Sequence, residues 1–183
     1  MKILFVTSEC APFSKSGGLA DVAFSLPPAL KEAGNEIAVI TPLYQCVREK
    51  YGGALTKTLE TTVRLGGLEA PCGLYRGELN GVAVWFVEND GFFERRKLYG
   101  YGDDKFRFAW FSRAVIELLY RLDFVPEILH CNDWETALTV IYLKNDQYWR
   151  SDLQHIKSVY TIHNIAYQGQ FGANELTGTF ALP

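Results

Sequence analysis

The first forty residues constrain the fold more than any other part of the chain. The run KILFVTS (residues 2–8) is short, apolar and rich in β-branched side chains, which is typical of a strand buried on both faces of a sheet. A loop, SKSGG, follows at residues 14–18. Apolar residues then recur at helical spacing over residues 19–33, with Gly34 placed as the stop. EIAVIT (36–41) is a second buried strand, and such a strand–helix–strand crossover predicts parallel pairing.

Two prolines, Pro27 and Pro28, fall inside this predicted helix. Proline lacks a backbone N–H donor, and its ring clashes with the preceding turn. We therefore expect a kink or a break at these residues.

The middle of the chain has a different pattern. Three strand-like segments, TLETTVRL (58–65), APCGLYRGEL (70–79) and VAVWFVEN (82–89), are separated by glycine-containing turns, among them Asn80-Gly81. Asn-Gly is a strong hairpin signal. We expect an antiparallel excursion here, and the third segment could belong either to it or to the parallel sheet.

The later half alternates between helix and strand again. A helix is expected over residues 107–122, a strand over 127–131, a helix from Trp134 onwards, and a strand over 158–162. The fold class predicted is α/β, with a doubly wound, mostly parallel, Rossmann-like sheet in one domain over residues 1–183. The last residues show no closing helix, so we expect the chain to be part of a larger protein.

Composition excludes several classes of function. Hydrophobic residues make up 48% and charged residues 21% of the 183 residues, as in a folded domain. The net charge of −3 gives no basic field for nucleic acid or an anionic membrane. The four cysteines form no CxxC motif, and no segment has the pattern of a signal peptide or a membrane span. We expect a cytoplasmic protein with reduced thiols and no metal ion.

The loop after the first strand carries Lys15, Gly17 and Gly18. Glycines have no Cβ, so their backbone N–H groups can approach an anion closely, and the following helix adds a positive dipole end. A plain turn with a solvated Lys15 is the alternative. Neither GxGxxG nor GxxxxGK[ST] is present. Asp21 is interpreted as a favourable charge near the helix N-terminus.

A second polar segment, HCNDWETAL (130–138), lies where a strand ends and a helix begins. Asn132 and Glu135 have the spacing of a capping box. Asp133, at the carboxyl end of a strand, is expected to point into a ligand crevice. Trp134 is expected to anchor the helix in the core.

The third polar segment is TIHNIAYQGQF (161–171), in which His163 and Asn164 follow a β-branched strand. Three polar segments thus fall at the carboxyl ends of three predicted strands. Because ligands of doubly wound sheets bind at these ends, we expect one shared crevice.

These segments together resemble a known family. VTSECAPFSK (6–15), KSGGLADV (15–22), HCNDW (130–134) and TIHNIAYQG (161–169), in this order, are similar to the bacterial glycogen synthases and plant starch synthases that use nucleotide-diphosphate glucose. RRKLYGYGDDKFRFAWFSRA (95–114) is a weaker match. The family has the two-domain GT-B architecture with its active site between the domains. The resemblance covers most of the first domain only and implies that a C-terminal nucleotide-binding domain is missing.

The resemblance implies retaining transfer of glucose from ADP-glucose, favoured over UDP-glucose, to the non-reducing end of an α-1,4-glucan such as glycogen. It implies no cofactor. His163 and Asp133 match residues that hold the transferred glucose. The implied substrate-binding residues are Lys15, Gly17, Gly18, Asp21, Tyr99, Asn164 and Tyr167. The chain departs from the family at Asn132 and Glu135, where bacterial members often carry histidines.

Three functions remain open on the sequence. The first is the glucose-side half of an ADP-glucose-dependent α-glucan synthase, inactive without its second domain. The second is a non-catalytic module that binds a glucan or a sugar nucleotide. The third is an unrelated NAD- or phosphate-binding α/β protein, against which the absence of both glycine fingerprints argues.

Overall fold

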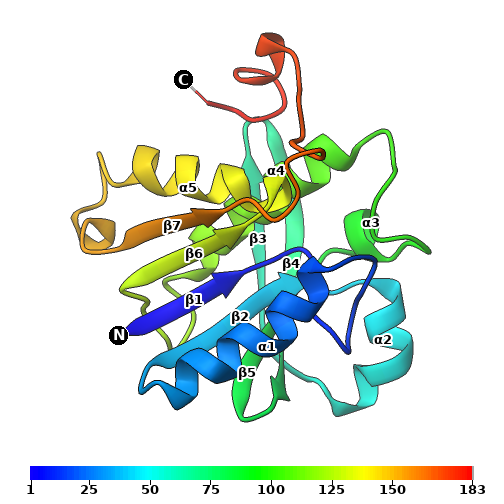
Figure 1. The fold of residues 1–183 in the computed structure, drawn as a ribbon. Coiled ribbons are helices and arrows are strands. Elements are labelled where there is room, and N and C mark those ends of the chain that lie inside the picture. The colour runs from blue at the N-terminus through cyan, green and yellow to red at the C-terminus, as the bar shows by residue number, and fades with distance from the viewer. Residues whose placement is uncertain (183) are drawn as a thin grey trace.

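The computed structural model describes residues 1–182 and contains a seven-stranded sheet (Figure 1). The strand order is β3-β4-β5-β2-β1-β6-β7. The strands β5, β2, β1, β6 and β7 pair in parallel, and β3 and β4 pair antiparallel. The bounds are β1 Lys2–Val6, β2 Glu36–Pro42, β3 Thr56–Leu65, β4 Leu68–Leu79, β5 Val82–Glu88, β6 Ile128–Asn132 and β7 Lys157–Thr161.

Helices lie on both faces of the sheet, which confirms the doubly wound α/β class. In Figure 1, α1 covers one face while α4 and α5 cover the other. Within residues 1–182, no helix combines the length and apolarity needed to cross a membrane. The helices are α1 Leu19–Glu32, α2 Gln45–Tyr51, α3 Asp90–Phe93, α4 Asp104–Leu118 and α5 Trp134–Asp146, with short 3-10 turns η1 Gly52–Ala54, η2 Ser151–Leu153 and η3 Ala173–Glu175.

The parallel sheet changes winding direction at β1. From β1 the chain crosses through α1 to β2 on one side, while β6 pairs with the other side of β1 and leads through α5 to β7. In an open α/β sheet, the carboxyl ends of the two strands beside such a reversal diverge and leave a crevice. The loops after β1 and β6 therefore meet at the site where a ligand is expected.

The antiparallel excursion is confirmed, and β5 belongs to both parts of the sheet. It pairs antiparallel with β4 and parallel with β2. Asn80 and Gly81 have φ angles of 50° and 75°, the two positive values that a type I′ hairpin requires. Asn-Gly is suited to this turn because neither residue pays the full steric penalty of the left-handed region.

Of the kink or break expected in the first helix, the break is wrong, because α1 continues through Pro27 and Pro28. Proline at position 27 leaves the Ala23 carbonyl without its helical N–H donor, and the Cys10 thiol lies 3.8 Å from that oxygen. Pro27 itself is buried with the apolar side of the helix, so packing offsets part of the lost hydrogen bonding. Gly34, with φ of 87°, follows the helix as predicted.

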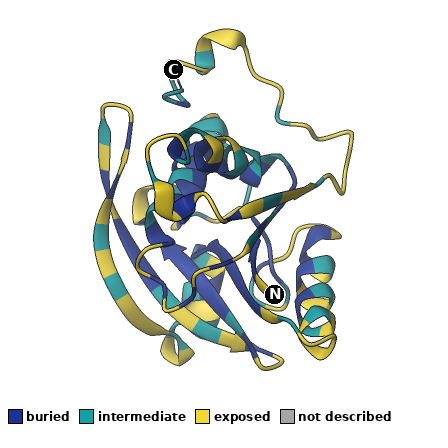
Figure 2. Cartoon of the chain, turned by 90° about the vertical axis from the view of Figure 1, so that its left-hand side faces the viewer, coloured by how far each residue is buried: buried dark blue, intermediate teal, exposed yellow. Residues whose placement is uncertain are grey.

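The helix expected over residues 107–122 is α4, which begins three residues earlier and ends four residues earlier. It is buried on almost every side, because β3 packs against it in addition to α5. Figure 2 shows the buried residues concentrated in the central strands and the facing sides of the helices. β7 ends the sheet in the described part of the chain, and its Val159 and Tyr160 are 44% and 41% exposed.

Candidate functional site

The loop after β1 is held by Glu9, a residue that the sequence reasoning did not select. Glu9 is 4% exposed. Its carboxylate accepts hydrogen bonds from the Ser16 N–H, from the Ser16 hydroxyl at 2.8 Å and from the Gly17 N–H at 3.1 Å. The anion that these loop amides bind is thus the protein's own carboxylate. The signal available in the sequence was an acidic residue three positions after a buried strand.

Lys15 and Asp21 form an ion pair at the start of α1. The Lys15 Nζ lies 2.6 Å from the Asp21 Oδ1, and the two side chains are 53% and 61% exposed. Exposed pairs of this kind contribute little to stability. Asp21 also lies in the first turn of α1, where a negative charge is favourable.

Asp133 joins the loops that follow β6 and β7. It immediately precedes α5 with a φ of 57°, an unusual angle for a residue other than glycine. Its Oδ1 accepts hydrogen bonds from the His163 N–H at 2.7 Å and the Asn164 N–H at 3.4 Å. The carboxylate therefore fixes the backbone of the third polar segment against the second.

The capping box expected for Asn132 and Glu135 is wrong, because Asn132 lies in β6 and Asp133 is the residue at the helix start. The Asn132 amide donates to the carbonyls of Val6 and His130, each at 3.0 Å. Its oxygen is therefore an acceptor and lies 2.9 Å from the His163 Nε2. This arrangement places the histidine proton on Nε2 and leaves Nδ1 as the acceptor of the neutral ring.

Glu135 is a second functional candidate that the sequence did not single out for binding. It is 8% exposed, and its Oε2 has no hydrogen-bond partner among residues 1–182. The pKa of Glu135 is raised to about 8, mainly by burial and in smaller part by the neighbouring carboxylates of Asp133, Glu9 and Asp104, while a hydrogen bond from its own backbone N–H opposes the shift. Glu135 is therefore mostly a neutral acid at pH 7.

Tyr99 connects the segment before α4 to the end of β1. Its hydroxyl donates to the Ser8 Oγ at 2.8 Å, and the buried Tyr44 hydroxyl donates to the Ser8 carbonyl at 2.9 Å. Burial raises the pKa of Tyr99 well above its usual value. The phenol consequently stays protonated and acts as a fixed hydrogen-bond donor.

These segments enclose one cavity of about 850 Å³. It brings together seven of the nine residues selected from the sequence, whereas Lys15 and Asp21 are not part of its wall. Its lining is Glu9, Ser16, Gly17, Gly18, Leu19, Val22, Tyr99, Gly100, Asp104, Asp133, Trp134, Glu135, His163, Asn164 and Tyr167. The wall has four carboxyl groups and no lysine or arginine. In the described part of the chain, no group of three His, Cys, Asp or Glu side chains is placed to hold a metal ion.

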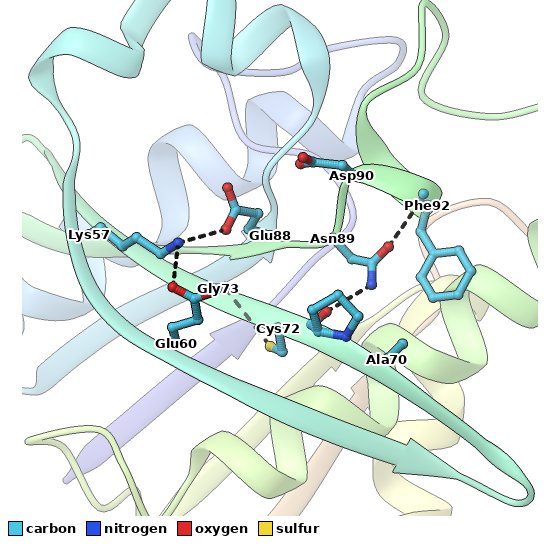
Figure 3. A pocket seen from close by; sticks show the side chains of 11 residues that line it. Lys57, Glu60, Ala70, Cys72, Gly73, Glu88, Asn89, Asp90 and Phe92 are labelled. Atoms are coloured by element: carbon cyan, nitrogen blue, oxygen red, sulfur yellow. Dashed lines mark hydrogen bonds and ion pairs between the residues drawn. The ribbon is translucent and has the colours of Figure 1, made fainter.

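A second cavity, of about 520 Å³, lies between the β3–β4 hairpin and α3 (Figure 3). Its charges are paired: the Lys57 Nζ lies 3.1 Å from Glu60 and 3.4 Å from Glu88. The Asn89 side chain donates to the Pro71 carbonyl and accepts from the Phe92 N–H. Since these polar groups already have partners, the larger cavity is the better candidate for a ligand site.

Comparisons with known proteins agree on one family. The family model for the starch synthase catalytic domain matches residues 2–183. A glycogen synthase of Clostridium novyi (strain NT) is 46% identical over 173 residues, covering 94% of this chain and 36% of that protein. A glycogen synthase of Streptococcus pneumoniae (strain CGSP14) is 43% identical over 182 residues, covering 100% of this chain and 38% of that protein.

A solved structure shows the same fold. The catalytic domain of starch synthase IV from Arabidopsis thaliana, bound to ADP and acarbose, superposes with a TM-score of 0.87 at 33% identity. The match covers 100% of this chain and 37% of that one. The chain thus spans a little over a third of the length of these relatives. The chain belongs to the starch synthase catalytic domain family.

Proposed function

We propose that this chain is the N-terminal domain of a two-domain GT-B glycosyltransferase that transfers glucose from ADP-glucose to the non-reducing end of an α-1,4-glucan. The observation that carries the proposal is the single cavity in which the segments after β1, β6 and β7 meet. The names of the relatives and the ADP and acarbose bound to the Arabidopsis enzyme support it.

His163 and Asp133 act at the transferred glucose in this proposal. Retaining transfer passes through a sugar with oxocarbenium-like charge, so nearby groups must be held in place rather than flexible. The Asp133 carboxylate holds the His163 and Asn164 backbone, and Asn132 orients the His163 ring. These contacts hold the His163 Nδ1 and the loop carbonyls in place to accept hydrogen bonds from sugar hydroxyls.

Gly17 and Gly18 let the donor approach the backbone at the start of α1. In both glycines the space around an added Cβ is open, so the loop surface is free for a ligand. Lys15 supplies the positive charge that the leaving diphosphate needs. Its ammonium group is held by Asp21 in the free chain and turns from Asp21 to the diphosphate on binding.

The second domain supplies the opposite wall of the cleft. Because this chain supplies only one wall of the proposed site, the 183-residue chain alone should incorporate no glucose into glycogen, whereas the two-domain protein should. Transfer is measured with radiolabelled ADP-glucose, and competition with UDP-glucose establishes which donor is preferred. His163→Ala in the two-domain protein should abolish most transfer, with exposed His155→Ala as the matched control. Turnover by the chain alone would contradict the two-domain arrangement.

The same assay separates the catalytic proposal from a binding module. A non-catalytic module would bind maltooligosaccharides or ADP-glucose without any transfer by the two-domain protein. We also propose a cytoplasmic location, which the four free cysteines of the described chain support. The acidic net charge supports partners that are neither nucleic acid nor anionic membrane.

A further inference from the structure

The inner wall of the cavity contains four carboxyl groups, and three of them have their hydrogen-bonding partners within the chain. Glu9 accepts from the loop after β1, and Asp133 accepts from the loop after β7. Asp104 accepts from Arg107 at 2.9 Å and from the Gly100 N–H at 2.7 Å. Glu135 differs from these three because its Oε2 has no partner in the described residues although the side chain is more than nine-tenths buried.

A buried polar atom without a partner is costly, and native proteins rarely retain one without a reason. The surroundings of Glu135 limit what its partner can be. An anion such as phosphate is disfavoured by Glu9, Asp104 and Asp133, and the lining has no lysine or arginine to offset them. A metal ion has no set of three ligands among residues 1–182. A neutral polyol fits, because each hydroxyl can both donate and accept.

We propose that Glu135 is a substrate-binding residue whose buried, unpartnered carboxyl group hydrogen-bonds hydroxyl groups of the donor's sugar. This proposal rests on the proposed function, because it assumes that the cavity takes a nucleotide sugar. The Oε2 is covered in the free chain, so on binding the carboxyl group turns toward the cavity that Glu135 lines. A neutral carboxyl group then offers one O–H donor and one carbonyl acceptor, which matches a pair of adjacent sugar hydroxyls. The nucleotide, with its diphosphate, lies away from this acidic wall.

Several elements face the Glu135 carboxyl and set its protonation. Asp133 precedes it, Glu9 approaches from the loop after β1, and Asp104 approaches from α4. Three phenols also interact with its charge: those of Tyr44, Tyr99 and Tyr160. Arg107 is the buried cation beside Asp104: its Nη1 lies 2.9 Å from the Asp104 Oδ1, and its Nε and Nη2 have no hydrogen-bond partner among residues 1–182. Ionisation of Glu135 would add a further negative charge to a lining that contains no lysine or arginine, so the neutral form is the one that binds.

The test measures binding of two probes, ADP-glucose and ADP, to the two-domain protein by calorimetry. Glu135→Ala should lower the affinity for ADP-glucose about tenfold, because one to two hydrogen bonds in a desolvated site are lost. The affinity for ADP should stay within about twofold of wild type. Glu135→Gln keeps a donor and an acceptor and should retain most affinity at pH 7. Exposed Glu32→Gln is the control for a change of charge.

A pH series adds a readout that a merely structural role would not change. Wild-type affinity for ADP-glucose should fall between pH 7 and pH 9 as Glu135 ionises, and Glu135→Gln should not show this fall. Two results would overturn the assignment: an equal loss of affinity for ADP and ADP-glucose in Glu135→Ala, or a pH profile of Glu135→Gln that matches that of wild type. If the wild-type protein transfers glucose and Glu135→Ala binds ADP-glucose as tightly as wild type, this inference alone is refuted. If the wild-type protein neither binds ADP-glucose nor transfers glucose, the proposed function is refuted.

Discussion

Glu135 also makes a prediction about stability that needs no substrate. Burial raises its pKa from the ordinary value of 4.5 to about 8. Between these two pH values the unfolded chain has released the proton while the folded chain retains it. The stabilisation that comes from this group is therefore complete below pH 4.5, declines as the pH rises, and is lost above pH 8.

The magnitude follows from the same two values. Each tenfold change in the protonation equilibrium corresponds to roughly 1.4 kcal/mol, so the full displacement costs the folded state up to about 5 kcal/mol at pH 8 and above. Glu135→Gln removes the titration and keeps the shape. The variant's free energy of unfolding, relative to wild type, should consequently rise by roughly 1.4 kcal/mol for each pH unit between pH 5 and pH 8 and then level off.

The assay is urea denaturation of the 183-residue chain at pH 5, 6, 7, 8 and 9, for wild type, Glu135→Gln and Glu32→Gln. The difference between wild type and Glu135→Gln is the quantity to follow, because titrating groups far from Glu135 cancel in it. The exposed Glu32 control should run parallel to wild type at every pH. Parallel curves for Glu135→Gln as well would show that the Glu135 carboxyl is solvated and titrates normally, which would contradict its burial.

Three further predictions test the loops and the thiols. Glu9→Gln leaves one accepting oxygen for the three donors of its loop, so it should lower the free energy of unfolding by about 1 to 3 kcal/mol in urea titrations. An unchanged urea midpoint would mean that the loop does not depend on the carboxylate. Gly169→Ala would bring a Cβ to 2.5 Å from the Trp134 ring at a φ of 59°. Chymotrypsin, which cleaves after aromatic residues such as Tyr167 and Phe171, should therefore cut the segment after β7 faster than in wild type, and equal cleavage would refute the close packing. Cys46 is the exposed thiol, and Ellman's reagent should label it alone in the native chain, because the other three are buried; rapid labelling of all four would contradict that burial.

The sequence predicted most of the fold because its signals were local. Each buried strand is a short apolar run, and each helix has its own periodicity, so the order of elements followed directly. The boundaries of α4 and the continuity of α1 through Pro27 depended on contacts with distant segments. The local sequence also could not show that β5 lies between β4 and β2, because strand pairing depends on the whole sheet.

The site was predictable to the extent that it depends on strand ends. Gly17, Asp133 and His163 follow β1, β6 and β7, and the rule for doubly wound sheets brought them to one cavity. The capping box failed because the Asn132 amide bonds to β1 and to the loop after β7, which a pattern of neighbouring residues does not reveal. Glu9 was missed for the same reason, since its partners lie seven and eight residues away across a loop.

The two carboxylates that fix the loops also constrain how a charged donor enters the cleft. Glu9 accepts hydrogen bonds from the N–H groups of Ser16 and Gly17, and Asp133 accepts them from those of His163 and Asn164. Both loops are therefore ordered before a ligand binds. These amides are consequently not available to a phosphate, and the wall they support is acidic. In the proposed function this chain accordingly presents the sugar-facing wall of the cleft, and the exposed Lys15, outside the cavity lining, is the cation that the first loop offers to the diphosphate.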